Sequence, residues 1–290
     1  MARRSLLWIL SLAALIVAYT LIARTISRPD IVPPAGDIAG AFAALVGRGY
    51  QPPGSDMPGM DMPGMDMPAH HHSSAQVDTL MQEGVTLQAS VAVTTARVLF
   101  GLVVGLPLGM LMGLLMGWSR RADDYLHPIY VLLRSVPPLA VITYIMLWLG
   151  HSEAHRLIPI VYAVAVTAVI PTYHGVRDVA GKYVVAAQSL GARGRLLLTK
   201  VVLPAAAPVV LGGLRYSIAI AWMTAVGAEM LMAENGMGNL LVGGGMWSSR
   251  LQTRSDPAVI IVGILVLAAA GWAMDLAARA WSARITRWAR

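Results

Sequence analysis

The chain has 290 residues, of which 57% are hydrophobic and only 13% are charged, and it contains no cysteine. A soluble domain carries charge on about a quarter of its residues, so this composition excludes an ordinary soluble domain, and the lack of cysteine excludes disulfides, thiolate metal sites and a cysteine nucleophile. The net charge of +7 comes from basic residues at the ends of apolar segments, which indicates membrane topology and not a nucleic-acid surface.

Six apolar segments are long enough to cross a bilayer, for which about 20 residues are needed. They span residues 6–23, 87–118, 126–149, 157–173, 209–232 and 258–278. The sequence therefore predicts an all-α integral membrane protein with about six transmembrane helices. We divide it into residues 1–84, an N-terminal helix with an extracytoplasmic segment, and residues 85–290, a helical core.

Basic residues are distributed unequally between the two sides of this topology. With the N-terminus inside, thirteen Lys and Arg residues fall on inner segments and six on outer segments. Cytoplasmic loops carry the excess of basic residues, so we expect both termini in the cytoplasm. Arg3 and Arg4 before the first segment also fit a secretory signal, but no small-x-small cleavage site follows, so we expect this segment to be retained as a helix.

A Met- and His-rich insertion occupies about residues 51–76, on the predicted outer side. Asp-Met-Pro-Gly-Met occurs at 56–60 and 61–65, and Asp-Met-Pro-Ala-His follows at 66–70. Thioether sulfur suits Cu(I), and imidazole also suits Cu(II), zinc and nickel. The candidate metal ligands are Met57, Met60, Met62, Met65, Met67, His70, His71 and His72. The alternative is a low-complexity insertion that binds no metal.

Glycine recurs at every fourth residue of the second span, at positions 101, 105, 109, 113 and 117. At 3.6 residues per turn these positions form one stripe along the helix, where the missing side chains let a neighbouring helix approach closely. We expect this groove to receive another helix of the same chain. A contact between two copies is the alternative.

Charged residues inside the predicted spans are costly and are therefore functional candidates. They are Arg97, Arg134, Arg215, Glu229 and Asp275. Arg97, Arg215 and Asp275 lie near helix ends, and we expect them to extend to the membrane interface. Pro137 and Pro138 must interrupt the helix beside Arg134, and irregular backbone at that depth normally lines a protected cavity. We predict that Arg134, Pro137, Pro138 and Glu229 line a path through the membrane. A structural ion pair or an interface position is the alternative for the two charged residues.

Residues 177–208 form a basic connection between two spans. Within it, a helical run is followed by a break at Gly191 and Ala192, a second helical run and a stop at Leu203-Pro204. This pattern predicts a helix-turn-helix outside the bilayer that docks on a partner. An ordinary helix C-cap at Gly191 is the alternative, and it would imply no docking surface.

Residues 185–208 resemble the cytoplasmic coupling loop of ABC-transporter permeases, whose motif is Glu-Ala-Ala, three residues, Gly-Ala, and about nine residues to Ile-x-Leu-Pro. The matching residues are Ala186, Ala187, Gly191, Ala192, Leu203 and Pro204. Residues 31–46, 134–140, 147–150 and 233–238 also resemble permeases of nitrate, sulfonate, taurine and related importers. The resemblance covers most of the chain from Ile31, and it departs from the motif at Val185, which replaces the glutamate.

This resemblance implies a type I ABC importer permease fold in a bacterial inner membrane. It also implies a pair of permease copies on two ATPase subunits, which receive a small solute from an extracytoplasmic binding protein. The chain has no G-x-x-x-x-G-K-[S/T] phosphate loop, so ATP must be handled by another polypeptide. No Ser, His and carboxylate set suggests an enzyme, and no cofactor is expected apart from copper at residues 51–76.

Three functions therefore stay open. The first is the permease of an importer for a small solute. The second is the handling of copper or another soft metal, or metal-gated transport, through the Met- and His-rich insertion. The third is a membrane anchor that binds an ATPase partner without moving a solute.

Overall fold

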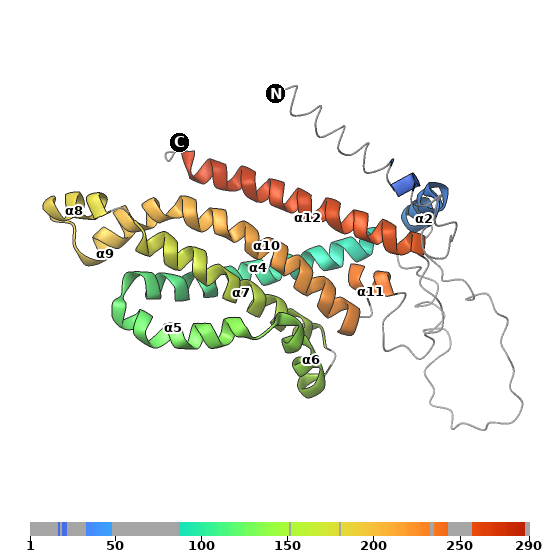
Figure 1. The fold of residues 1–290 in the computed structure, drawn as a ribbon, viewed down its shortest axis with the longest axis horizontal. Helices are drawn as coiled ribbons and strands as arrows, with labels where there is room; N and C mark the ends of the chain where they lie inside the picture. Colours follow the sequence, from blue (N-terminus) through green and yellow to red (C-terminus); the bar gives the residue numbers. More distant parts are fainter. Residues whose placement is uncertain are drawn as a thin grey trace, which may run out of the picture. The chain divides into compact units, whose positions relative to one another are not determined.

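The computed structural model describes residues 17, 19–21, 33–47, 87–150, 152–179, 181–232, 235–242 and 257–287, which are helical apart from short connections. The helices are α2 (Ala35–Gly47), α4 (Leu87–Trp118), α5 (Arg120–Ser135), α6 (Pro138–Leu149), α7 (Glu153–Arg177), α8 (Gly181–Ser189), α9 (Gly194–Leu197), the π-helical turn η1 (Leu198–Val202), α10 (Leu203–Met232), α11 (Met237–Val242) and α12 (Pro257–Ile285) (Figure 1).

The chain forms two compact units. The smaller unit comprises Met1–Ser90 and Leu240–Val266, and the larger comprises Val91–Asn239 and Leu267–Arg290. Within the smaller unit, the Tyr19 hydroxyl donates a hydrogen bond to the carbonyl of Pro33 at 2.8 Å. The division predicted at residues 84 and 85 lies outside the described residues. All the sites below belong to the larger unit.

Four helical stretches among the described residues are long and apolar enough to cross a membrane: α4, α7, the continuous helix Gly194–Leu231 and α12. The pair α5 and α6 adds a fifth if it counts as one span, although its two halves meet at 81°. Five of the six predicted spans thus have a counterpart. Residues 6–23, the predicted first span, lie outside the described residues except for Val17 and 19–21, which are helical.

The glycine stripe of α4 packs against α7. A Cβ atom at Gly105 would lie 2.8 Å from the carbonyl oxygen of Val161, and one at Gly109 would collide with the carbonyl of Ala165. These distances leave no space for a side chain, so the two helix backbones are in direct contact. The stripe therefore serves packing within the chain, as the sequence predicted.

α7 and α10 run side by side through the larger unit (Figure 1). Their facing side chains join those of α4 in one buried apolar cluster, which α12 covers on one side. The cluster consists of Val98, Leu102, Ile160, Val164, Ile218, Ala221, Trp222 and Ala225. Small residues at its centre let the helices approach, and the larger ones fill the space between them.

The two prolines after α5 break the third span. Val136 and Pro137 are extended, with ψ of 118° and 135°, and Pro138 begins α6, a position where a missing N–H costs no helical hydrogen bond. At the interruption, the Val136 N–H donates to the carbonyl of Leu133, and the Tyr162 hydroxyl of α7 lies within hydrogen-bond distance of the carbonyls of Leu133 and Val136. The predicted break is confirmed, and a side chain of α7 contacts carbonyls on both sides of it.

Candidate coupling and translocation sites

Gly191 ends α8 as a helix cap. Its φ is +85°, a conformation that favours glycine. Its N–H donates to the carbonyl of Gln188, and the N–H of Ala192 donates to the carbonyl of Ala187, both at 2.9 Å. This pair of bonds is a Schellman motif. Gly191 therefore forms a helix C-cap, and this cap also redirects the chain from α8 into α9.

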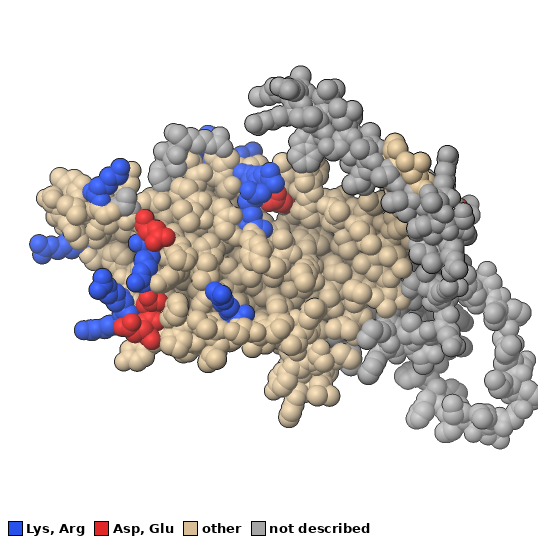
Figure 2. All heavy atoms as spheres, viewed as in Figure 1, with Lys and Arg blue, Asp and Glu red and all other residues tan. Residues whose placement is uncertain are grey.

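The segment from α8 to η1 has one packed face and one exposed face. The packed side chains, which contact the buried cluster around Val176, Val202 and Ala206, include Val184, Ala187, Ala192 and Leu197. The exposed ones include Tyr183, Val185, Ala186, Leu190 and Leu196, together with Lys182, Arg193 and Arg195. Leu190, beside the cap, is 89% exposed. Figure 2 shows Lys and Arg side chains gathered over this end of the unit.

The chain does not stop at Leu203 and Pro204, so that prediction was wrong. The helix is continuous from Gly194 to Leu231. A proline removes one N–H and its ring crowds the carbonyl four residues earlier, but the π-helical turn just before it widens the backbone. There the N–H of Leu203 bonds to the carbonyl of Leu198, five residues back. Pro204 is accommodated in the first turn of α10.

A buried ion network joins α4, α7 and α10 at the C-terminal end of α10. Arg97 is 5% exposed, and its guanidinium donates to Glu229 at 2.7 Å and to both carboxylate oxygens of Glu153 at 2.6 and 3.2 Å. It also donates to the side chain and the main-chain carbonyl of Asn235, at 2.6 and 3.1 Å. All the donors of this guanidinium are engaged.

Glu229 lies in the last turn of α10 and is completely buried. Its second oxygen accepts from the Thr94 hydroxyl at 2.8 Å and from the N–H of Gly238 at 2.9 Å. Gly236 has φ of +104°, and a Cβ atom there would lie 2.5 Å from the Glu229 carboxyl carbon. Only glycine allows the chain to cover the carboxylate so closely.

The three charged residues expected at the interface are all paired. Arg97 turns inward to the network described above. Arg215 of α10 forms two bonds to Asp275 of α12, at 2.7 and 3.1 Å, and Arg279 also contacts Asp275. Arg97 is buried and not extended to water, because helix packing brings carboxylates close to its guanidinium.

Arg134 lies at the end of α5 and lines a hollow of about 520 Å³ among α5, α7 and α10, called the Arg134 hollow below. Its lining includes Tyr130, Val166, Thr167, Pro171 and Tyr216. Pro137 and Pro138 form the break just beyond it. Glu229 is absent from this lining and pairs with Arg97, and its place on a path stays a prediction.

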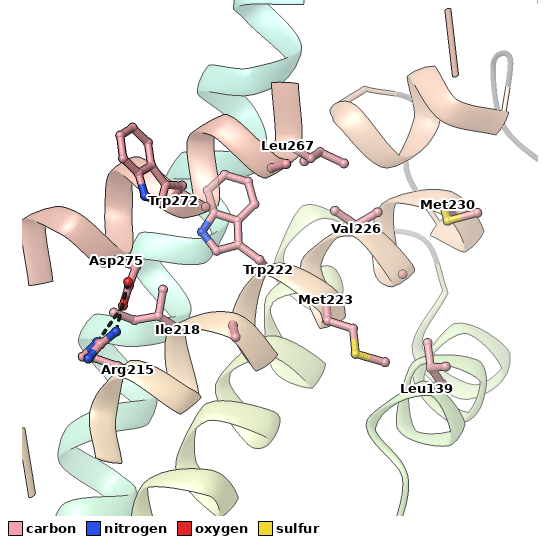
Figure 3. A pocket seen from close by; sticks show the side chains of 14 residues that line it. Leu139, Arg215, Ile218, Trp222, Met223, Val226, Met230, Leu267, Trp272 and Asp275 are labelled. Atoms are coloured by element: carbon pink, nitrogen blue, oxygen red, sulfur yellow. Dashed lines mark hydrogen bonds and ion pairs between the residues drawn. The ribbon is translucent and has the colours of Figure 1, made fainter. Parts of the chain in front are cut away.

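A larger hollow, of about 630 Å³, lies between α10 and α12. Figure 3 shows the Arg215–Asp275 pair at one end, with Trp222 and Trp272 beside it and Met230 toward the other end. The charges in its lining cancel, and the rest of the lining is almost entirely apolar. This hollow therefore has no net charge with which to attract an ionic solute.

Residues 105–287 match the family described as the binding-protein-dependent transport system inner membrane component. This match covers more than half of the chain. The chain belongs to this family. The permease is 33% identical to a probable ABC transporter permease of Brucella melitensis, over 72% of this chain and 82% of that protein. It is 32% identical to the taurine transport system permease protein TauC of Escherichia coli (strain K12), over 70% of this chain and 71% of that one.

A third relative is the putative aliphatic sulfonates transport permease protein SsuC of Escherichia coli (strain K12), which is 33% identical over 68% of this chain and 73% of its own. Among solved structures, the permease is similar to the inward-facing MetNI methionine ABC transporter, with a TM-score of 0.54, 18% identity, and coverage of 69% of this chain and 94% of that one. An amino acid ABC transporter is similar with a TM-score of 0.52 and 14% identity, with coverage of 76% of this chain and 99% of that one.

These likenesses confirm the predicted all-α fold of an ABC importer permease and the predicted function, the permease component of such an importer. The family consists of transport subunits, which favours transport over a mere membrane anchor. The eight predicted metal ligands, from Met57 to His72, lie outside the described residues. Among the residues that are described, no three His, Asp or Glu side chains gather as metal ligands. Copper binding stays a prediction, which titration of a peptide of residues 51–76 with Cu(I) would test.

Sequence reasoning missed three members of the buried network: Thr94, Glu153 and Asn235. Two signals pointed toward it. Arg97 and Glu229 are opposite charges inside apolar spans, where each needs a partner, and the Asn235–Gly238 stretch carries two glycines where the backbone must approach closely. Glu153 gave no signal of its own, because an acidic residue in the first turn of a helix is common.

Proposed function

We propose that α8 and α9 of this permease dock on a separate ATPase subunit, which binds and hydrolyses the ATP that drives import. The proposal rests mainly on one observation, the continuous helix from Gly194 to Leu231. It joins the exposed α8–α9 surface to the Arg97 network. At 1.5 Å per residue, such a 38-residue helix extends about 57 Å, enough to cross the bilayer.

The division of the α8–α9 segment into two faces supports this role. Its packed face anchors it to the core of the permease, and its exposed face presents apolar and basic side chains to a partner. Ala186 and Leu190 lie on the exposed face, while Ala187, Gly191 and Ala192 build the cap that holds the turn. A rigid turn transmits a displacement, because packed helices move as bodies and do not deform continuously.

Val185, which replaces the expected glutamate, is 61% exposed on α8. Docking at this position therefore relies on apolar contact, with Lys182, Arg193 and Arg195 around it as charged groups. A groove on the ATPase that has an apolar floor and acidic edges would complement this surface.

The orientation of the permease follows from the same assignment. We infer that α8 and α9 face the cytoplasm of a bacterial cell, where ATP is available, and that both chain termini lie on that side of the inner membrane. The Arg97 network then lies toward the outer side, where an extracytoplasmic binding protein would deliver the solute. We also propose a pair of permease copies, because one set of these helices encloses only part of a pathway.

The solute is proposed to be a small organic anion. Two relatives of this permease are named for taurine and for aliphatic sulfonates. Both solute classes carry a sulfonate group, so a sulfonate or a similar oxyanion is the solute class to test first.

Replacing Gly191 by valine tests the coupling assignment. A β-branched residue at φ +85° is strained by about 1–2 kcal/mol or more, which should distort the turn and reduce solute uptake about tenfold while ATP hydrolysis persists. The matched control is Gly181→Val, at the exposed start of α8, where an added Cβ atom meets nothing within 4 Å. Uptake by Gly191→Val equal to that of the control would contradict the assignment.

A further inference from the structure

Among the three arginines inside the predicted spans, Arg134 differs from Arg97 and Arg215 because it has no carboxylate partner in the described part of the chain. Arg97 and Arg215 each pair with a buried or half-buried carboxylate. None of the ion pairs formed by the described residues includes Arg134. Its electrostatic partner is the phenol of Tyr130, one turn earlier on α5. The lining of the Arg134 hollow contains no Asp or Glu. The hollow therefore carries one net positive charge.

The broken backbone nearby does not account for this charge. The carbonyls of Leu133 and Val136, on either side of the break, accept hydrogen bonds from Tyr162. Arg134 is thus not required to satisfy them. All three helices around the hollow belong to segments that are apolar enough to span a membrane. A cation at such a place is costly unless it meets water or an anion, and the low dielectric strengthens its attraction for an anion.

We propose that the Arg134 hollow binds the anionic head group of the solute, a sulfonate, a carboxylate or another oxyanion, during its passage through the permease. The guanidinium matches two oxygens of such a group with parallel N–H donors. Tyr130 and Tyr216 line the same hollow, and a tyrosine hydroxyl can donate to a third oxygen. The inference rests on the proposed function, because a site among spanning helices serves a solute only if the permease transports one.

The size of the hollow agrees with this ligand class. Its volume of about 520 Å³ lies within the range of about 300–1,000 Å³ of small-molecule sites. Val166, Ile170 and Pro171 are apolar members of the same lining, and they suit the short carbon chain of an organic anion. The head group of an anionic lipid has the same chemistry and is the competing source of ligand.

The test measures binding directly in the whole complex of permease, ATPase and binding protein. Tyr216 is replaced by 3-fluorotyrosine, the complex is placed in phosphatidylcholine nanodiscs, and the fluorine signal is followed while ethanesulfonate is added. Ethylammonium, a cation of similar size, serves as the control solute. A second set of nanodiscs contains phosphatidylglycerol, an anionic lipid that would compete if lipid head groups occupy the hollow.

We expect a saturable change with ethanesulfonate in both lipids and none with ethylammonium. Arg134→Gln should weaken the affinity at least about tenfold, since a charge-assisted hydrogen bond is lost, and Arg134→Lys should fall between the two. The matched control Arg215→Gln removes an arginine from the other hollow and should leave the affinity unchanged. No saturable change, or equal affinity in Arg134→Gln, overturns the proposal. Binding that phosphatidylglycerol abolishes overturns the solute assignment in favour of a lipid head group.

Stimulation of ATP hydrolysis by the solute-loaded binding protein is measured on the same complexes. It separates the two proposals. If ethanesulfonate binds in an Arg134-dependent way but hydrolysis is never stimulated, the coupling assignment fails and the anion site stands. If stimulation is normal and no Arg134-dependent binding is seen, the anion site fails and the coupling assignment stands.

Discussion

Glu229→Gln should destabilise the permease strongly, because it removes a negative charge from the buried Arg97 network. Glutamine keeps the shape of the side chain and removes its charge, so the buried Arg97 is left with the half-exposed Glu153 as its charged partner. Either the Arg97 guanidinium or the two donors of Thr94 and Gly238, at 2.8 and 2.9 Å, must then face an amide N–H₂ group. Removing one partner of a buried ion pair costs about 3–5 kcal/mol, and we expect a loss of this size.

The free energy of unfolding can be measured by titrating the purified permease in mixed micelles with SDS while far-ultraviolet circular dichroism reports helix content. The control is Arg177→Gln, which removes an ion pair with Asp123 between helix ends, where Arg177 is 45% exposed. Such a pair contributes about 1 kcal/mol or less. If Glu229→Gln lowers stability no more than this control, the network does not hold the helices together. Arg97→Met combined with Glu229→Met should recover part of the loss, since no buried charge is then left between these two positions.

Two further predictions concern packing and topology. Gly109→Ala should lower the free energy of unfolding by about 1–3 kcal/mol, because its methyl group meets the backbone of α7, whereas Gly212→Ala, with nothing within 4 Å, should be neutral or slightly stabilising; equal effects in the SDS titration would contradict the close contact of α4 and α7. The chain has no cysteine, so single substitutions can be labelled selectively. Ser189→Cys should react with a membrane-impermeant maleimide only in inside-out vesicles and Ser152→Cys only in right-side-out ones, and the reverse pattern would contradict the inferred orientation.

Features that depend on one helix were predictable. The apolar spans, the glycine stripe of α4 and the break at Pro137 each follow from local rules, since a backbone in lipid must satisfy its own hydrogen bonds and a proline cannot donate one. The stop expected at Pro204 failed for an equally local reason. A π-helical turn can absorb a proline, but no residue pattern in 198–202 distinguishes it from an α-helical turn.

Pairing between helices was not predictable in the same way. Arg97 and Glu229 are 132 residues apart, and the same rule that a membrane charge needs a partner applied equally to Arg134 and Arg215. The spacing of residues along one helix does not show which of these three arginines pairs with Glu229.

Hydropathy and residue pattern are enough to predict a bundle of membrane-spanning helices with a basic connection that contains a glycine turn. Hydropathy and length are properties of each segment alone, so no neighbour is needed to read them. The partners of the charged residues, by contrast, become visible in the folded chain, where Glu229 pairs with Arg97, Asp275 pairs with Arg215, and Arg134 lines a hollow without a carboxylate. Charge compensation in a low dielectric acts over a few ångströms, and which groups come that close is set by how α4, α7, α10 and α12 pack.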